Sequence, residues 1–224
     1  MHIGKIFPIE LNETTAHLAG VIIGDGYIDG GFKGGKTPNS KSYRVSIDLT
    51  DFESMSFIVS IIKEIIPTSV KIRIVKARLR CKPTWRFSVS NKSLWHFFTK
   101  TLGVPAGKKS RLVSVPQPIL NGSNVIKKTF LAGIFDADGG LRGNRIGLTT
   151  ASPVMSKQLD LLFRELGFEC NISSWVIKSY NWRYYGVNIR NRDIDRFLKE
   201  IPLRDRRKKV AIARRFICGG TEVV

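Results

Sequence analysis

The chain has 224 residues, of which 37 are Lys or Arg and 18 are Asp or Glu, giving a formal net charge of +19. Its hydrophobic content of 42% is typical of a folded protein and excludes a disordered tail. No apolar run reaches the roughly 18 residues that a membrane span needs, so we expect no membrane partner. The excess of positive charge predicts a polyanionic partner, with nucleic acid as the first candidate.

The three cysteines, Cys81, Cys170 and Cys218, are far apart and form no CxxC motif. We expect free thiols in an intracellular, reducing compartment, without a zinc site. The sequence does not distinguish an archaeal cytoplasm from an organelle.

The first half of the chain opens with the apolar, helix-like run HLAGVIIGDGYI at 17–28, which contains Asp25 and Gly26. A Gly-rich loop at 29–41 follows. Periodicity then predicts four further segments: a strand at 43–50, a helix at 52–65, a hairpin with strands at 70–80 and 85–90, and a helix at 91–98.

The second half repeats this order. LAGIFDADG at 131–139 matches LAGVIIGDG at 18–26 with an offset of 113. Three later landmarks match at an offset of 100: the strand at 144–150, the segment at 191–198, and Lys208-Lys209 after Lys108-Lys109. A helix at 152–167 and a hairpin with strands at 171–179 and 184–190 lie between them.

The duplication predicts an α+β protein made of two pseudo-symmetric αββαββα repeats. The first repeat covers residues 1–109, a Pro-containing linker covers 110–127, and the second repeat covers 128–224. An internal pseudo-two-fold suits a monomer that binds double-stranded DNA, whose two strands are related by two-folds.

Each opening helix carries a stripe of small residues four apart. The stripes consist of Ala16, Gly20 and Gly24 in the first helix and of Thr129, Gly133 and Ala137 in the second. Because Gly costs about 1 kcal/mol inside a helix, two such stripes favour close packing of the two helices against each other.

Asp25 and Asp138 occupy equivalent positions, each just before a glycine, Gly26 or Gly139, that suits a helix-terminating conformation. Two carboxylates at helix C-termini repel each other, and a divalent cation such as Mg²⁺ would remove that repulsion. Solvated turn residues are the alternative. Asp136 has no acidic counterpart in the first motif, so we expect it to form a cap or a local salt bridge.

The two motifs resemble the signature of the LAGLIDADG homing endonucleases, in the single-chain form with two motifs. The resemblance covers nearly the whole chain, although the first motif departs from the consensus at Ile23 and Gly24. It implies that the motif helices meet at the interface between the repeats and that the antiparallel sheets form a DNA-binding saddle.

The resemblance further implies a site-specific, intron-encoded double-strand DNA endonuclease that leaves short 3′ overhangs. Two or three Mg²⁺ ions, for which Mn²⁺ can substitute, would be held by Asp25 and Asp138 with the backbone oxygens of Gly24 and Ala137. Basic residues near the cleavage centres match Lys108 and Lys208, with Lys109 and Lys209 as alternatives.

The strands should supply the DNA contacts, because a two-stranded ribbon fits the major groove. In the first repeat we expect contacts from Arg44, Asp48, Arg73, Lys76, Arg78, Arg80, Arg86 and Ser88. In the second repeat we expect them from Arg142, Arg145, Lys178, Asn181, Arg183, Tyr184, Asn188 and Arg190. The basic run at 204–215 suits phosphate contacts better than a nuclear-import signal.

Two other functions are compatible with this scaffold. One is an intron RNA-splicing maturase, which would add intron RNA as a partner. The other is a cleavage-dead DNA-binding regulator, against which the retention of both Asp25 and Asp138 argues. We do not expect an intein-embedded nuclease, since the sequence shows no Cys or Ser start and no terminal His-Asn.

Overall fold

The computed structural model describes residues 6–30, 42–49, 52–66, 84–142 and 145–216, together with the backbone of 71–75. The chain divides into two compact units. The first unit comprises Met1–Leu11 and Asp25–Lys109, and the second comprises Asn12–Gly24 and Ser110–Val224.

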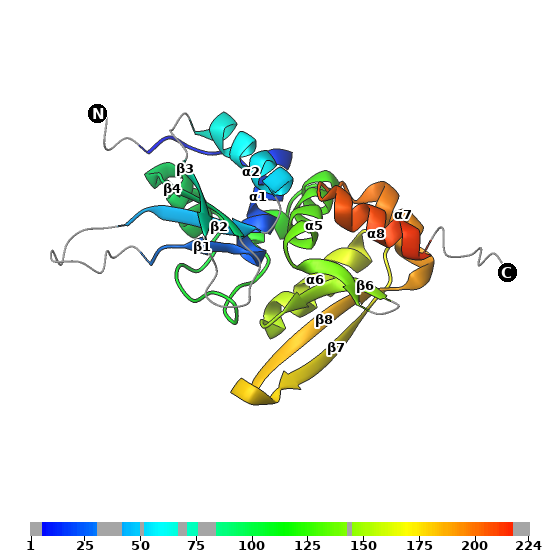
Figure 1. Ribbon diagram of the computed structural model, residues 1–224. Helices are drawn as coiled ribbons and strands as arrows, with labels where there is room; N and C mark the ends of the chain where they lie inside the picture. The colour runs from blue at the N-terminus through cyan, green and yellow to red at the C-terminus, as the bar shows by residue number, and fades with distance from the viewer. Residues whose placement is uncertain are drawn as a thin grey trace. The chain divides into compact units, whose positions relative to one another are not determined.

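The first unit contains one antiparallel four-stranded sheet in the order β1-β2-β4-β3 (Figure 1). We call it the first sheet. Its strands are β1 (Gly26–Ile28), β2 (Arg44–Leu49), β3 (Lys71–Val75) and β4 (Thr84–Ser90). The helices of this unit are α2 (Phe52–Ile65) and α3 (Lys92–His96), which continues as a π-helical turn over Phe97–Thr101.

One face of the first sheet forms the core of this unit. Val45, Ile47 and Phe87 alternate with polar residues along their strands and are at most 1% exposed, and α2 covers them with Met55 and Ile62. The strand and helix periods in the sequence therefore place their apolar residues on facing surfaces. The opposite face of the sheet is polar.

The second unit contains the second sheet, with the equivalent order β5-β6-β8-β7. Its strands are β5 (Gly139–Arg142), β6 (Arg145–Thr150), β7 (Cys170–Ile177) and β8 (Trp182–Ile189). The helices are α1 (Glu13–Gly24), α4 (Gln117–Leu120), α5 (Asn124–Asp138), α6 (Pro153–Glu165), α7 (Ile194–Glu200) and α8 (Arg206–Phe216). Short 3₁₀ turns cover Lys178–Tyr180 and Asn191–Asp193.

Aromatic packing dominates the core of the second unit. Phe197 of α7 lies within 6.3 Å, between ring centroids, of Phe135, Phe163 and Phe168. These four rings join α5, α6 and α7. Cys170 lies at the edge of this core as a free thiol, and burial raises its pKa to about 12.

The predicted α+β architecture is confirmed, and the two sheets repeat one strand order. One expected match is wrong, however. Ile47 lies opposite Phe87 and Leu148 lies opposite Val187, so β2 and β6 correspond at an offset of 101 rather than 100. A one-residue slip exchanges the two faces of a strand. The outward-facing positions are therefore identified from the strand pairing and not from the sequence match.

The second hairpin also differs from its prediction. Its strand β8 begins at Trp182, two residues earlier than expected, and Ile177 pairs with Trp182. Asn181 closes the turn with a left-handed backbone, φ 51°. Asn tolerates this conformation better than most residues, which explains how so short a turn reverses the chain.

Candidate functional site

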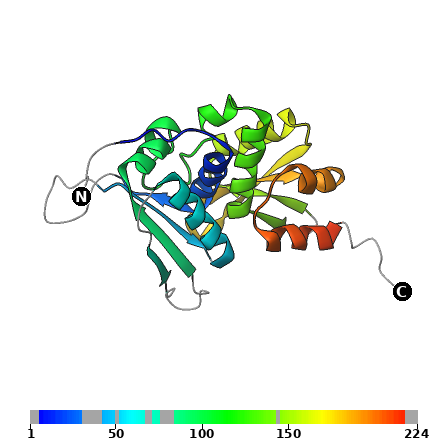
Figure 2. The same cartoon turned by 90° about the horizontal axis from the view of Figure 1, so that it is seen from above.

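The two motif helices, α1 and α5, lie side by side through their glycines (Figures 1 and 2). A Cβ atom on Gly20 would lie 2.5 Å from the carbonyl oxygen of Phe130, and one on Gly133 would lie 2.0 Å from that of His17. No side chain fits at such distances. The close packing predicted from the small-residue stripes is therefore confirmed.

Asp138 ends α5 beside the C-terminal end of α1. A Cβ atom on Gly24, the last residue of α1, would lie 3.1 Å from a carboxylate oxygen of Asp138. Both helix ends carry partial negative charge, so the carboxylate lies in a negative environment. The Arg142 guanidinium is near enough to interact: burial lowers the pKa of Arg142, and the Asp138 carboxylate acts in the opposite direction.

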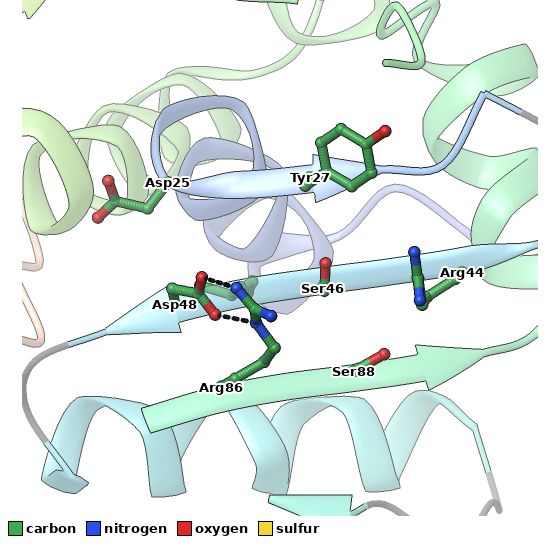
Figure 3. A pocket seen from close by; sticks show the side chains of 8 residues that line it. Asp25, Tyr27, Arg44, Ser46, Asp48, Arg86 and Ser88 are labelled. Atoms are coloured by element: carbon green, nitrogen blue, oxygen red, sulfur yellow. Dashed lines mark hydrogen bonds and ion pairs between the residues drawn. The ribbon is translucent and has the colours of Figure 1, made fainter. Parts of the chain in front are cut away.

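Asp25 follows Gly24 in the chain and belongs to the first unit. It lines a depression of about 420 Å³ on the outward face of the first sheet (Figure 3). The other lining residues are Tyr27, Arg44, Ser46, Ile47, Asp48, Arg86 and Ser88. This acidic residue therefore lies at the edge of a surface made of strand residues.

The donors at these helix ends are oxygen atoms. Among the described residues, no three or more His, Cys, Asp and Glu side chains group together as a metal site. A carboxylate between two helix C-termini suits a hard cation such as Mg²⁺, which keeps several waters and accepts phosphate as a further ligand. The Asp138 carboxylate therefore has donor chemistry that fits such an ion.

The predicted glycine caps have a different explanation. Gly139 has an extended backbone, with φ −83° and ψ 161°, and not a left-handed one. A Cβ atom there would lie 2.4 Å from the ring of Phe135. The expectation of a helix-terminating conformation is wrong for Gly139, because steric room for the Phe135 ring requires this glycine.

Lys208 caps the C-terminal end of α5. Its Nζ donates hydrogen bonds to the carbonyl oxygens of Phe135, Asp136 and Ala137, at 3.0, 2.6 and 2.9 Å. A helix leaves its last carbonyls without internal partners, and a cation there offsets the helix dipole. Lys208 therefore has a structural role, and the Ala137 oxygen uses one of its two lone pairs on this ammonium.

Asp136 joins three segments of the second unit. Its carboxylate lies 2.9 Å from His17 Nε2 and accepts hydrogen bonds from the backbone N–H groups of Arg204 and Asp205, at 2.9 and 3.2 Å. Asp205 in turn accepts from the backbone N–H of Lys208 at the start of α8. The predicted role of Asp136 in a cap or local salt bridge is confirmed.

The two lysine pairs occupy different environments. In the first pair Lys108 is exposed and Lys109 is buried, with 6% of its surface accessible. In the second pair Lys208 is half-buried and Lys209 is exposed. Burial therefore falls on the second member of one pair and on the first member of the other, which the constant sequence offset does not indicate.

On the outward face of the first sheet, carboxylates hold the arginines. Arg86 donates from Nε and Nη2 to the two oxygens of Asp48, at 2.6 and 2.5 Å (Figure 3). This hydrogen bonding raises the pKa of Arg86. Arg44 Nη2 lies 3.2 Å from Asp29 Oδ2. These pairs fix the direction of both guanidinium groups before any ligand arrives.

The outward face of the second sheet is different. A smaller depression of about 280 Å³ is lined by Arg145, Asn171, Ile189, Arg190 and Asn191. No carboxylate among the described residues forms an ion pair with Arg145 or Arg190. Asn171 was missed from the sequence, although the alternation of NISSW places it on the same face as Trp175.

Two predicted contact residues of the second sheet are not available on this outward face. Asn188 lies on it, opposite Asn171, but is buried, and Arg183 lies on the other face. Asn188 is 4% exposed, and its amide donates to Ser173 Oγ at 3.1 Å and to the Gly186 carbonyl at 3.3 Å. Arg183 pairs with Val176, so it lies on the opposite face from Trp175. Both bonds use the Asn188 amide nitrogen, so this side chain is not available to a ligand. Arg183 points to the opposite face of the sheet.

The remaining predicted contacts divide into two groups. Lys178 and Asn181 are exposed at the turn of the second hairpin, and Tyr184 lies beside Trp175 on its outward face. Lys76, Arg78, Arg80 and the side chain of Arg73 lie outside the described residues. The basic run at 204–215 forms helix α8, whose charged residues are largely exposed around the buried Ile212. Within the described part of the chain, no helix has the length and apolarity of a membrane span.

Residues 126–202 match the family model of the LAGLIDADG-like domain. Curated relatives include the replication factor C small subunit of Methanocaldococcus jannaschii, 27% identical over 89% of this chain. The ATP-dependent DNA helicase Hel308 of Thermococcus kodakarensis is 29% identical over 73% of this chain. The chain spans only 10% and 14% of the lengths of these two relatives.

Solved structures share the fold. I-DmoI in complex with DNA and Ca superposes with a TM-score of 0.63 at 21% identity, over 90% of this chain and 97% of that one. The homing endonuclease I-WcaI bound to its DNA recognition sequence gives 0.57 at 20% identity, over 91% and 88%. Full-length DUF199/WhiA gives 0.59 at 15% identity, over 97% and 64%.

At these identities the structural likeness concerns the fold. Together with the match at 126–202, it confirms the resemblance that the two motifs carry. Residues 126–202 match the LAGLIDADG-like domain, and the chain has the fold of the LAGLIDADG homing endonucleases.

Proposed function

We propose that this protein with the LAGLIDADG fold is a site-specific, metal-dependent DNA endonuclease that acts as a monomer. It would cut both strands of a long duplex site and leave short 3′ overhangs, as an intron-encoded homing enzyme does. One observation carries the proposal: Asp138 ends a glycine-packed helix beside the C-terminus of α1, after which Asp25 follows directly.

Asp25 and Asp138 would hold the Mg²⁺ ions, with Gly24 and Ala137 contributing backbone oxygens. When bound, Mg²⁺ or Mn²⁺ lowers the pKa of a coordinated water and stabilises negative charge on the phosphate. No His or Ser nucleophile is needed. The use of Ala137 is restricted by its hydrogen bond to Lys208, which leaves one lone pair of its oxygen for a metal.

The side chains around Asp138 have separate tasks in this proposal. Arg142 would bind a nonbridging phosphate oxygen and stabilise the charge that develops during cleavage. Lys208 would hold the end of α5 in place and thereby position Asp138. Lys108, which is exposed, would order solvent or contact phosphate at the other cleavage centre, with Lys109 as the alternative.

The outward faces of the two sheets would bind the duplex. Arg44 and Arg86, held by carboxylates, would meet base edges in a defined direction. Arg145 and Arg190, together with Asn171, would contact phosphates or bases from the second sheet. Exposed charges on α8 would add phosphate contacts, so affinity should fall steeply as salt rises.

The test is incubation with a randomised duplex library and Mg²⁺, followed by sequencing of the cut ends. We expect staggered cuts at one long site. Asp25→Asn and Asp138→Asn should each abolish cleavage while duplex binding is retained, because the metal would lose a charged ligand. Asp195→Asn is the matched control: this carboxylate is exposed on α7, away from the motif, and its removal should leave cleavage unchanged.

Wild-type activity in both Asn variants would contradict the catalytic assignment. Tight duplex binding without cleavage by the wild-type protein, with Mg²⁺ or Mn²⁺ present, would instead identify a DNA-binding regulator. Thermal unfolding of each variant must match the wild type, so that loss of activity is not mistaken for loss of structure.

A further inference from the structure

The outward face of the second sheet carries exposed aromatic rings. Trp175 of β7 and Trp182 of β8 are 38% and 40% exposed. Tyr184 lies directly across from Trp175 in the sheet. Their ring planes differ by 18° and their centroids are 6.2 Å apart, so the two nearly parallel rings form an offset stack. Water-exposed tryptophans of this kind point to an interaction surface.

A glycine makes room for this surface. A Cβ atom on Gly186 would lie 3.2 Å from Trp175 Cζ3 and 2.9 Å from Ser173 Oγ. The indole of Trp175 therefore lies against the strand where a side chain is missing. Because this contact and the neighbouring Tyr184 restrict the ring, binding a planar ligand would cost little side-chain entropy.

Arginines accompany the rings. The guanidinium carbon of Arg111 is 4.1 Å from the centroid of Trp182, and that of Arg142 is 5.8 Å from the centroid of Trp175. Both distances allow cation–π attraction. We call Trp175, Trp182, Tyr184, Arg111 and Arg142 the aromatic platform. Its rings can stack on bases, and its two guanidinium groups can bind the phosphates of the nucleic acid that carries those bases.

The chemistry of this platform does not match an intact duplex. In double-stranded DNA each base has its faces covered by its neighbours, and only its edges are accessible, to hydrogen-bonding side chains. An aromatic ring face gains most from an unpaired base, whose own face is free. The depression of the first sheet, by contrast, is lined by two serines, two aspartates and two arginines, with Tyr27 and Ile47, and these polar groups suit base edges.

We propose that the aromatic platform stacks the unpaired bases of a single-stranded nucleic acid segment. The binding would be tolerant of sequence, because every base has a π face, and sensitive to salt, because Arg111 and Arg142 would meet phosphates. Such a segment could be a loop of folded RNA or a locally unpaired DNA strand. This binding goes beyond duplex cleavage and does not depend on it.

The test compares three labelled 20-nucleotide probes in EDTA: single-stranded DNA, single-stranded RNA, and a blunt duplex without the cleavage site. Trp175→Leu should weaken binding of a single-stranded probe about tenfold, the scale of one lost base stack, and leave duplex binding within about twofold. Val176→Ser is the matched control, since Val176 is exposed on the opposite face of the same strand. It should change neither affinity.

Two further measurements keep the test independent of folding. Arg111→Gln leaves every ring in place and should weaken single-strand binding severalfold, while Trp175→Phe should retain most of it. Loss confined to RNA would identify RNA as the ligand, and loss confined to single-stranded DNA would identify an unpaired DNA strand. Either result supports the platform.

Equal losses for single-stranded and duplex probes, or no loss with correctly folded Trp175→Leu and Arg111→Gln proteins, would overturn the proposal. The result is separable from the proposed nuclease activity. Asp25→Asn, which changes no residue of the platform's unit, should bind single strands like the wild type even though it should no longer cut. A protein that never cuts DNA could still show the platform's preference.

Discussion

In the first sheet, Arg44 and Arg86 are each held by a carboxylate, and short polar side chains lie between them. In the second sheet, Trp175, Trp182 and Tyr184 are spread over the outward face, and no carboxylate of the described residues pairs with Arg145 there. The strand order is nonetheless the same in both sheets.

The difference teaches that duplication preserved the backbone and the inward faces but not the outward faces. A core position must match its neighbours in volume, which restricts change. An outward position is constrained by the ligand that it binds and not by packing. We therefore interpret the first sheet as a surface for base edges and the second sheet as a surface that also accepts base faces.

The largest expected effect is a difference in stability between substitutions at two equivalent positions, Gly147 of β6 and Ser46 of β2. A Cβ atom on Gly147 would lie 2.4 Å from the carbonyl oxygen of Val187, so Gly147→Ala should destabilise the protein by about 2–3 kcal/mol through overpacking. Ser46, in the equivalent place on β2, already carries a side chain, and Ser46→Ala should change stability by less than about 0.5 kcal/mol. Urea unfolding measures both. Equal values would show that the two sheets are packed alike.

The next effect concerns the lysine pairs. Lys208→Met removes three hydrogen bonds to the end of α5 and should lower stability by about 1–2 kcal/mol, whereas the exposed Lys108→Met should be nearly neutral. Thermal unfolding distinguishes them. If Lys208→Met keeps wild-type stability but abolishes DNA cleavage, Lys208 is catalytic and not a cap.

A smaller effect distinguishes paired from unpaired arginines. Asp48→Asn removes a negative charge from the first sheet and frees Arg86, so duplex affinity should rise about threefold and the salt slope should steepen by about one. Arg145→Gln should change both quantities in the opposite direction. Fluorescence anisotropy over a range of salt concentrations tests this, and identical responses would remove the distinction between the two faces.

The smallest effect lies behind the second sheet, where Glu200 binds Arg196 and Lys128. The hydrogen bond from Arg196, followed by that from Lys128, lowers the pKa of Glu200 to about 2. A lowered pKa means stability that is present above the unfolded-state pKa of about 4.3 and is lost as the pH falls towards 2. Glu200→Gln should therefore lower Tm slightly at pH 7, and the difference should shrink between pH 4 and pH 2. A constant difference would contradict this assignment.

The spacing of residues in the motifs predicted several features of the second unit from the sequence. The four-residue repeat of small side chains predicted the contact of α1 with α5, because residues four apart share a helix face. The lack of an acidic counterpart for Asp136 predicted its capping role, and alternation predicted β2 and β6. These are local patterns in the sequence. The helix and strand patterns follow the periods of the helix and strand backbones.

Other features of the candidate site could not be predicted in this way. The burial of Lys109, the capping by Lys208 and the burial of Asn188 depend on residues distant in sequence. The shift from an offset of 100 to 101 follows from the pairing of β2 with β4 and of β6 with β8, which matches Val45 with Ile146 and Ile47 with Leu148. Gly186 and Trp175 meet only because β7 and β8 pair as they do.

By itself, the sequence determined the duplicated αββαββα order, the glycine contact between the motif helices and the positions of two equivalent acids. These follow from backbone periodicity, which nearby residues specify. Only the tertiary structure decided which lysine is committed to a helix end, which arginines are held by carboxylates and which rings share a surface. Those outcomes depend on strand pairing and side-chain packing between distant segments, where a shift of a single residue exchanges an inward for an outward position.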